Sequence, residues 1–261
     1  MMRITDTVKH LLIINVIFFV ATYAFANMNN VGFNQSILIQ KLALFYPSNP
    51  NFGYWQYVSS MFMHGSLMHI FFNMFALASF GSALESMWGR NKFLFFYFAT
   101  GIGAGILYTL VNYYQFNGVS QELFSIGMTP EQIQTMFDTG KYPSILLEEI
   151  SEENINILFS SLRQTYFTPA LGASGALYGV LVAFAYKFPN AELGIMFIPV
   201  PVKAKYFVPI ILVLDLFLGL TGKSIFGGNG TGIAHFAHLG GALTGYLLML
   251  YYQQNQVKRW D

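Results

Sequence analysis

Long apolar runs separated by polar connections dominate the pattern along the chain. Six runs approach the roughly 20 residues that a helix needs to cross a bilayer. They are Leu11–Ala26, Leu67–Leu84, Phe93–Tyr114, Ala173–Phe188, Tyr206–Leu220 and Ile233–Tyr252. The ten-residue alternation of a transmembrane β-barrel is missing, and so is an internal repeat of the transporter kind. We therefore predict an all-α membrane protein with a bundle of six transmembrane helices.

Composition supports a membrane protein and excludes several chemistries. Only 25 of the 261 residues are charged (13 basic plus 12 acidic) and 54% are hydrophobic, whereas about a quarter of an ordinary globular domain is charged. A net charge of +1 argues against nucleic acid as a partner. Because the chain has no cysteine, disulfides, thiolate chemistry and cysteine-type zinc sites are excluded. We treat residues 1–261 as a single membrane domain.

The distribution of basic residues predicts the orientation of the six spans. An even number of spans places both termini on one side of the membrane. That side collects nine of the 13 basic residues, namely Arg3, Lys9, Arg90, Lys92, Lys187, Lys203, Lys205, Lys258 and Arg259. The other side keeps Lys41, Lys141, Arg163 and Lys223. We therefore expect cytoplasmic termini, in a bacterial cytoplasmic (inner) membrane.

Two connections between the spans are long. Asn27–Tyr57 is rich in aromatic residues, Pro and Asn, and Trp55 suits a segment that lies at the membrane interface. Residues 115–170 carry seven acidic and two basic side chains, a net charge of −5 (2 − 7), which predicts an external insertion. Within it, Thr129-Pro130 and Ser151 have the residue types that begin helices.

The candidate chemistry centres on a serine between two glycines in Leu171–Gly179. Packing does not require the hydroxyl of Ser174, because Ala would fill the same space without a polar group. Gly175 and Gly179 are four residues apart and leave one helix face smooth. Further along, His238 precedes a matching pair, Gly241 and Gly245. Two smooth helix faces that bring a serine and a histidine together predict a nucleophile and its base.

A second polar pair lies at the start of the second span. His69 and Asn73 are four residues apart and share one helix face. Either side chain alone could simply bond a neighbouring helix. However, polar groups inside a membrane usually face a protein interior or a wet cavity. Since Ser174 and His238 are expected at the same depth, we predict that the four side chains form one cluster.

These motifs resemble those of the rhomboid family of intramembrane serine proteases over nearly the whole chain. The family's Gly-x-Ser-Gly-x-x-Tyr is found at Gly172–Tyr178, and its Ala-His-x-x-Gly-x-x-x-Gly at Ala237–Gly245. Its His-x4-His-x3-Asn is found at His64, His69 and Asn73. Glu85 before Gly89-Arg90 also matches. Two departures are Trp55-Gln56, where many members have Trp-Arg, and the long insertion.

The resemblance implies a serine–histidine dyad, with the ring of Tyr178 stacked on His238. His238 would take the proton of Ser174 during attack on a peptide carbonyl. The candidate oxyanion donors are the side chains of His69 and Asn73 and the backbone N–H groups around Gly172 and Ala173. Gly241 and Gly245 would support the site.

Two further polar residues lie near the dyad in sequence. Asp215 in span five is expected to be a gate or a packing group. His235 lies at the edge of the glycine face, where we expect it to pair with a loop carbonyl or a water molecule. The spacing of His235 and His238 would also allow a metal, but no His-Glu-x-x-His helix is present. We expect neither a metal nor a cofactor.

The predicted substrates are transmembrane helices, cleaved near the outer membrane face where Gly, Pro or polar residues help them unwind. The resemblance adds a preference for a small residue before the scissile bond. Besides these substrates, the lipid bilayer is the expected partner, and the oligomeric state is left open. One alternative is a small transporter, which would need polar residues through the full depth of the membrane. The other is an inactive rhomboid-like protein that binds transmembrane helices.

Overall fold

The structure is a computed structural model that describes residues 3–143, 146, 150–195, 198–222 and 233–257. Lys223, Lys258 and Arg259, which the orientation argument uses, lie outside these residues. Most of the described chain is helical. The elements in chain order are α1 (Asp6–Met28), η1 (Phe33–Gln35), α2 (Ile37–Leu42), α3 (Gln56–Ser59), η2 (Ser60–Phe62), α4 (Leu67–Ala76), η3 (Leu77–Gly81), α5 (Ser82–Trp88), α6 (Arg90–Ser125), α7 (Pro130–Thr139), α9 (Glu152–Phe167), α10 (Ser174–Lys187), β1 (Glu192–Ile195), β2 (Ile198–Lys203), α11 (Ala204–Thr221) and α12 (Ile233–Val257).

Four described helical stretches are long and apolar enough to cross a membrane. They are Asp6–Met28, Leu67–Trp88, Arg90–Ser125 and Ala204–Thr221, which contain the predicted spans one, two, three and five. The second is built from α4, α5 and the π-helical turn η3 between them. Helix α10 has only 14 residues, about 21 Å of helix, and α12 is not among the four. The membrane character is confirmed, whereas the count of six spans stays a prediction.

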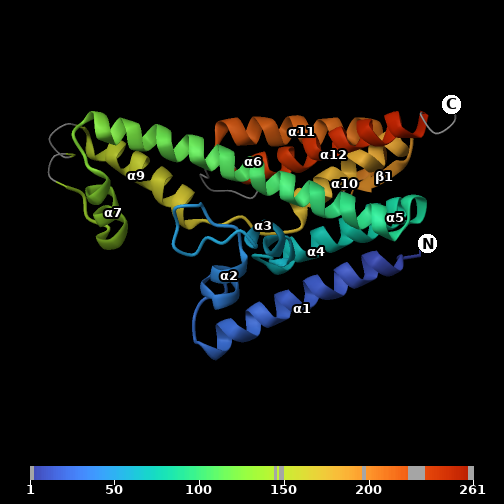
Figure 1. The fold of residues 1–261 in the computed structure, drawn as a ribbon, viewed down its shortest axis with the longest axis horizontal. Helices are drawn as coiled ribbons and strands as arrows, with labels where there is room; N and C mark the ends of the chain where they lie inside the picture. Colours follow the sequence, from blue (N-terminus) through green and yellow to red (C-terminus); the bar gives the residue numbers. More distant parts are fainter. Residues whose placement is uncertain (1–2, 144–145, 147–149, 196–197, 223–232, 258–261) are drawn as a thin grey trace.

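Helices α6, α10 and α12 pack together and form the centre of the bundle (Figure 1). The predicted contact between the glycine faces of α10 and α12 is present. A Cβ atom added to Gly241 would lie 1.8 Å from the carbonyl oxygen of Gly175, and one added to Gly245 would lie 2.7 Å from Cα of Gly179. Only glycine allows backbones to come this close. The start of α10 is thereby held directly against the start of α12.

Helix α1 lies beside the second span and is attached to it through a buried carboxylate. Glu85 in α5 accepts hydrogen bonds from the backbone N–H groups of Thr7 (3.1 Å) and Val8 (3.0 Å) in the first turn of α1. These N–H groups have no acceptor within the helix, and a negative charge is favourable at a helix N-terminus. These bonds hold the first turn of α1 against the bundle.

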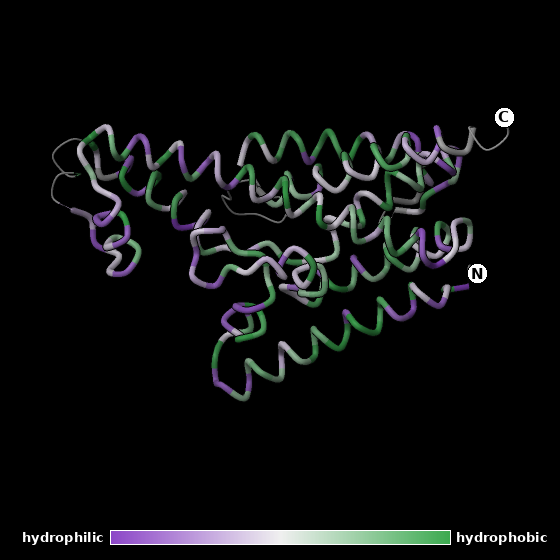
Figure 2. The backbone as a smooth tube through the Cα atoms, in the orientation of Figure 1, coloured by the Kyte–Doolittle hydropathy of each residue, from purple (hydrophilic) through white to green (hydrophobic). Residues whose placement is uncertain are grey.

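The insertion extends the third span. Helix α6 has 36 residues, about 54 Å of helix, so it continues past the predicted end at Tyr114 and beyond a hydrocarbon core about 30 Å thick. Helix α9 packs back along it, and α7 shares a hydrophobic cluster with α9 and the last turns of α6. They begin where predicted, because Thr129 and Ser151 each accept a bond from the backbone N–H three residues later. Figure 2 shows polar positions gathering along α7 and apolar ones along α1 and α11.

The insertion has a hydrophobic core of its own, which we call the cap core. It is made of Tyr46, Leu123, Met128, Ile133, Met136, Phe137, Leu146, Ile155, Phe159, Leu162 and Tyr166. A separate cluster fills the bundle, and the two clusters share no buried residue. In Figure 1 the insertion lies at the opposite end of the molecule from the start of α1 and the end of α12.

The first connection is tied together by one buried glutamine. Gln56 accepts a bond from the N–H of Phe45 (3.2 Å) and donates to the carbonyl of Asn51 (2.7 Å). Gln56 occupies the place where many rhomboids have arginine, and it satisfies the loop backbone without a charge. Trp55 is exposed, as an interfacial segment requires. That interfacial position remains a prediction.

The mostly helical structure agrees with the all-α prediction, and it also contains one short β-hairpin that the sequence did not predict. Strands β1 and β2 pair in antiparallel fashion, with Glu192 opposite Lys203 and Leu193 opposite Val202. They have four and six residues, which is too short to produce the longer alternation that marks a strand in the sequence. The hairpin connects α10 to α11.

Candidate active site

Ser174 is the first residue of α10, and the turn before it positions the hydroxyl. Gly172 in that turn has φ +119°, a conformation that favours glycine. Its N–H donates to the carbonyl of Ser60 (2.9 Å), which ties the turn to η2. Ala173 follows as the fully buried N-cap residue. The chain thus enters α10 with Ser174 facing the start of α12.

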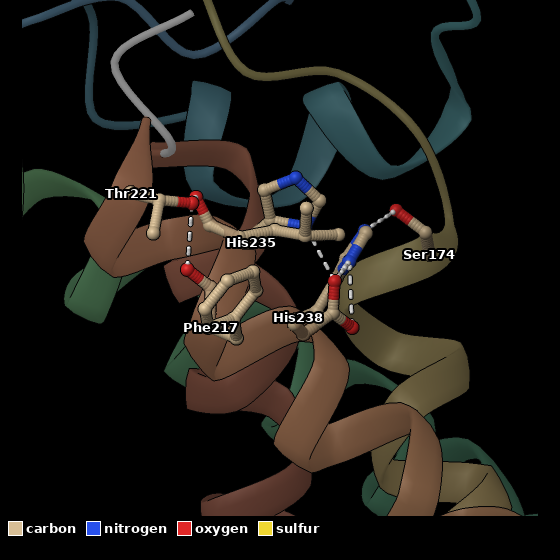
Figure 3. A network of polar contacts seen from close by, with 7 residues as sticks. Ser174, Phe217, Thr221, His235 and His238 are labelled. Atoms are coloured by element: carbon tan, nitrogen blue, oxygen red, sulfur yellow. Dashed lines mark hydrogen bonds and ion pairs between the residues drawn. The ribbon is translucent and has the colours of Figure 1, made fainter. Parts of the chain in front are cut away.

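Ser174 and His238 are in hydrogen-bond contact. The Oγ atom of Ser174 lies 2.9 Å from Nε2 of His238, as drawn in Figure 3. The ring of Tyr178, one turn further along α10, stacks on the imidazole with 4.3 Å between centroids and 9° between planes. Three residues from two separate motifs are therefore brought together on two packed helices.

Asp215 lies on the other side of His238, on α11. Nδ1 of His238 is 3.5 Å from Oδ1 and 3.4 Å from Oδ2 of this carboxylate. The same Oδ1 is 2.5 Å from Nδ1 of His235. Nδ1 of His235 therefore pairs with Asp215, and the predicted bond of His235 to a loop carbonyl or a water molecule stays a prediction. The only signal in the sequence was that Asp215 is the single acidic residue of span five.

These three residues also raise the question of a metal. Within the described part of the chain, ligand atoms of Asp215, His235 and His238 all lie within 4.8 Å of one another. Two ligands about 2.0–2.1 Å from one tetrahedral zinc are separated by roughly 3.3 Å. The 2.5 Å between Nδ1 of His235 and Oδ1 of Asp215 is shorter than that separation and marks a direct contact between the two side chains. The present arrangement therefore fits a hydrogen-bonded carboxylate better than a metal centre.

The predicted oxyanion donors gather around the turn at Gly172. A Cβ atom placed on Gly172 would lie 2.6 Å from Nε2 of His69 and 3.4 Å from Nδ2 of Asn73. Nδ2 of Asn73 is buried and has no hydrogen-bond partner among the described residues. Nδ1 of His69 accepts from the N–H of Gly65 (3.5 Å), which leaves Nε2 as the N–H donor. Both side chains thus present a donor beside the turn that precedes Ser174.

The backbone donors differ from the prediction at one position. The N–H of Gly172 already donates to Ser60, so it is not free to bind an oxyanion, and Gly172 shapes the turn instead. By contrast, Ser174 opens α10, and the first N–H groups of a helix have no acceptor within it. The Ser174 amide is therefore a better candidate than the Gly172 amide.

His64 lies directly behind the donors. Its ring packs edge-on against His69, with 5.0 Å between centroids. Burial, together with the neighbouring His69, lowers the pKa of His64 to about 3. His64 is therefore uncharged at neutral pH and fills the space behind His69 without adding a positive charge.

Ser174 and His238 thus lie in hydrogen-bond contact on two packed helices of a membrane protein. The family model for the rhomboid domain matches residues 51–129 and 145–255. The chain belongs to the rhomboid family, and the resemblance of its motifs is confirmed. Within the insertion, only residues 130–144 fall outside the match, so most of the insertion is less of a departure than its length suggested.

Curated relatives agree with this assignment. The chain is 28% identical over 205 residues to an uncharacterized mitochondrial rhomboid protein of Schizosaccharomyces pombe, covering 76% of this chain and 50% of that protein. It is 28% identical to the mitochondrial Rhomboid protein 1 of Saccharomyces cerevisiae (73% and 39% covered). It is 29% identical to the mitochondrial presenilin-associated rhomboid-like protein A of Danio rerio (72% and 35% covered). The chain thus spans half or less of the length of these relatives.

The names of the relatives contradict the predicted location. All three are mitochondrial proteins of eukaryotes, so the prediction of a bacterial cytoplasmic membrane is wrong by this comparison. Charge asymmetry distinguishes one side of a bilayer from the other, but it carries no information about which membrane holds the protein. At the level of the family, function is intramembrane proteolysis of transmembrane substrates.

Proposed function

We propose that this protein is a serine endopeptidase that cleaves transmembrane helices with a Ser174–His238 dyad. The observation that carries the proposal is the 2.9 Å contact between Oγ of Ser174 and Nε2 of His238. A hydroxyl is a weak nucleophile unless an adjacent base removes its proton. Stacking of Tyr178 holds the imidazole of His238 in the plane needed for that transfer.

The reaction follows from these positions. His238 Nε2 takes the proton as Ser174 Oγ attacks the peptide carbonyl, and then returns it to the leaving amine. Water hydrolyses the resulting acyl-enzyme by the same route in reverse. The negative charge on the carbonyl oxygen needs donors that are already in place. The unpaired Nδ2 of Asn73 and Nε2 of His69 are suited to this task because both lie beside Gly172.

The substrate class follows from the location of the dyad. A transmembrane helix hides its carbonyl groups in hydrogen bonds, so a substrate must unwind before Ser174 can attack. Ser174 opens α10 shortly after Ala170, whose backbone pairs with Leu44 of the first connection. We therefore place cleavage near the membrane face that carries the insertion, at helix segments weakened by Gly, Pro or polar residues.

Labelling with a fluorophosphonate tests the proposal, combined with cleavage of a reporter transmembrane helix in the same detergent. We expect the wild type to be labelled and active, and Ser174→Ala to lose both. Ser82→Ala is the matched control, because Ser82 is a buried serine on α5 outside the site. It should keep labelling and cleavage. Substantial cleavage by folded Ser174→Ala would overturn the dyad, and an unlabelled, inactive wild type would favour an inactive helix-binding protein.

A further inference from the structure

Asp215 is a nearly fully buried acidic residue in a helix that is apolar enough to span a membrane. Its exposure is 3%, and α11 is one of the four candidate spans. A carboxylate in such surroundings is costly unless charged or hydrogen-bonded groups compensate it. The side chains that face it are His238, His235 and Tyr178. An acid retained at this cost, next to the base of the site, requires an explanation beyond packing.

We propose that Asp215 is a positioning residue for His238, so that the site works as a Ser174–His238–Asp215 triad. His235 is the second support, because it holds the carboxylate in place. The inference rests on the proposed function and assigns to Asp215 a role that a serine–histidine dyad does not require.

The two ring nitrogens of His238 have different neighbours, and this fixes their roles. Nε2 lies at 2.9 Å from Ser174 Oγ and must be unprotonated to act as the base. In neutral imidazole the proton is then on Nδ1, which faces Asp215 at 3.4–3.5 Å. The carboxylate therefore selects the productive tautomer. It also stabilises the imidazolium that forms when Ser174 gives up its proton.

The distances indicate how the carboxylate is shared. The contact with His235 at 2.5 Å is short, whereas 3.4–3.5 Å to His238 is longer than the usual 2.7–3.2 Å of such a bond. Catalytic hydrogen bonds are often long without substrate and tighten when it binds. A movement of roughly 0.5 Å would bring Nδ1 of His238 into range. His235 keeps Asp215 close enough for that small movement to suffice.

Other titratable groups near His238 do not supply this charge. They are Tyr178 on α10, His235 on α12 and His69 on α4. When the histidines are neutral, Asp215 carries the only formal charge among the described side chains that contact His238. A change in the pH dependence of cleavage on removing that charge is therefore attributable to Asp215.

The test compares Asp215→Asn with the wild type in the same lipid. The amide keeps the shape but loses the charge, and it can present its N–H₂ to His238 and stabilise the wrong tautomer. We expect kcat to fall by on the order of 10² to 10⁴ with KM little changed. The acidic limb of the pH–rate profile, measured from about pH 5 to pH 9, should move to lower pH. Asp215→Glu should recover part of the activity.

The matched control is Glu85→Gln, which neutralises another buried acid in a candidate span. Glu85 bonds to the start of α1 and not to the dyad, so its loss should reduce thermal stability and leave kcat and the pH profile unchanged. His235→Ala should cost about tenfold in kcat. In the Asp215→Asn background, His235→Ala should cost nothing further, because both changes remove the same support.

Several outcomes overturn the inference. One is an Asp215→Asn variant whose kcat and pH profile match those of the wild type. Another is an Asp215→Asn variant that loses activity only because its melting temperature is lower, with the pH profile unchanged. Inactivation of the wild type by a chelator, with zinc bound by the wild type and not by Asp215→Asn, would show a metal site instead. If Ser174→Ala remains active, the proposed function itself fails. If Ser174→Ala is inactive while Asp215→Asn matches the wild type, only the triad fails.

Discussion

At the residue scale, Asn73 is buried although one of its hydrogen-bond donors has no partner among the described residues. Its side chain is buried in α4, yet Nδ2 has no partner among the described residues. A buried donor left unpaired costs about 1–3 kcal/mol, so a residue that serves only to join helices should not be in this state. A donor that serves to bind an oxyanion is expected to be unpaired when no substrate is bound. Because this donor also lies beside Gly172, Asn73 is placed to bind an oxyanion next to Ser174.

Asn73→Ala should lower turnover by about 10² to 10³ while fluorophosphonate labelling of Ser174 continues at a reduced rate. Because the lost Nδ2 has no hydrogen-bond partner among the described residues, thermal stability should change little. Asn15→Ala on α1 is a suitable control, since its buried Nδ2 donates to the carbonyl of Leu11 at 2.7 Å. This control should lose stability and keep its turnover. Unchanged turnover with a sharp loss of stability in Asn73→Ala would return Asn73 to a structural role.

Ser174 and His238 should behave as one unit. Ser174→Ala and His238→Ala should each reduce cleavage of a reporter helix to background, because each removes the same covalent step. The double variant should be no worse than either single variant. Additive losses, measured as initial rates in the same lipid, would show that the two side chains act in separate steps.

At the element scale, the site depends on how closely α10 and α12 approach. Gly241 leaves no room for a side chain, since an added Cβ would meet the carbonyl oxygen of Gly175 at 1.8 Å. That oxygen belongs to the backbone and cannot rotate away. The contact therefore determines both the spacing of the two helices and the distance between Ser174 and His238.

Gly241→Ala should destabilise the fold by about 1–3 kcal/mol or more, through overpacking, and should reduce Ser174 labelling as the helices separate. Gly118→Ala is the matched control, because nothing lies within 4 Å of its added Cβ on α6. At that position, replacing glycine with alanine should raise the free energy of unfolding by roughly 0.5–1 kcal/mol. Thermal unfolding of the two variants in one detergent shows whether each substitution stabilises or destabilises the fold. Equal stability would mean that the glycine contact is not present in the membrane.

At the scale of the whole molecule, two of the hydrophobic clusters among the described residues lie at different points along α6. The cap core and the bundle core have no buried residue in common. Phe137 is central to the cap core, with its ring stacked on Tyr166 at 4.8 Å between centroids. Since separate cores can open separately, the insertion should unfold without the bundle.

Phe137→Ala should cost about 3–5 kcal/mol of local stability and expose the amides of α7 and α9 to hydrogen exchange. The amides of α10 should stay protected, and Ser174 should still be labelled. Phe124→Ala, at a partly exposed position on α6, is the control. It should neither reduce local stability nor expose the amides of α7 and α9. If Phe137→Ala also removes protection from α10, the insertion is part of the same cooperative unit as the site.

The sequence by itself determined the features that depend on local patterns. Apolar runs predicted the four confirmed candidate spans, and Thr129 and Ser151 marked the starts of α7 and α9, because caps and hydropathy involve residues close together in the chain. The glycine pairs predicted which faces of α10 and α12 meet. The glycine spacing pointed to Ser174 and His238, and the family resemblance added Tyr178; the structure brings all three into contact.

Only the tertiary structure decided the contacts that depend on how helices are rotated and how deep they sit. No local pattern reports that Asp215 on α11 faces His238 and His235 on α12, because the two helices are connected through residues that carry no such signal. The same holds for the Gly172 amide, whose acceptor Ser60 lies more than 100 residues earlier in the chain. The extension of α6 into the insertion depends on the cap core that its last turns help to form. Each of these features is stabilised by packing between distant segments, which a pattern along one segment does not encode.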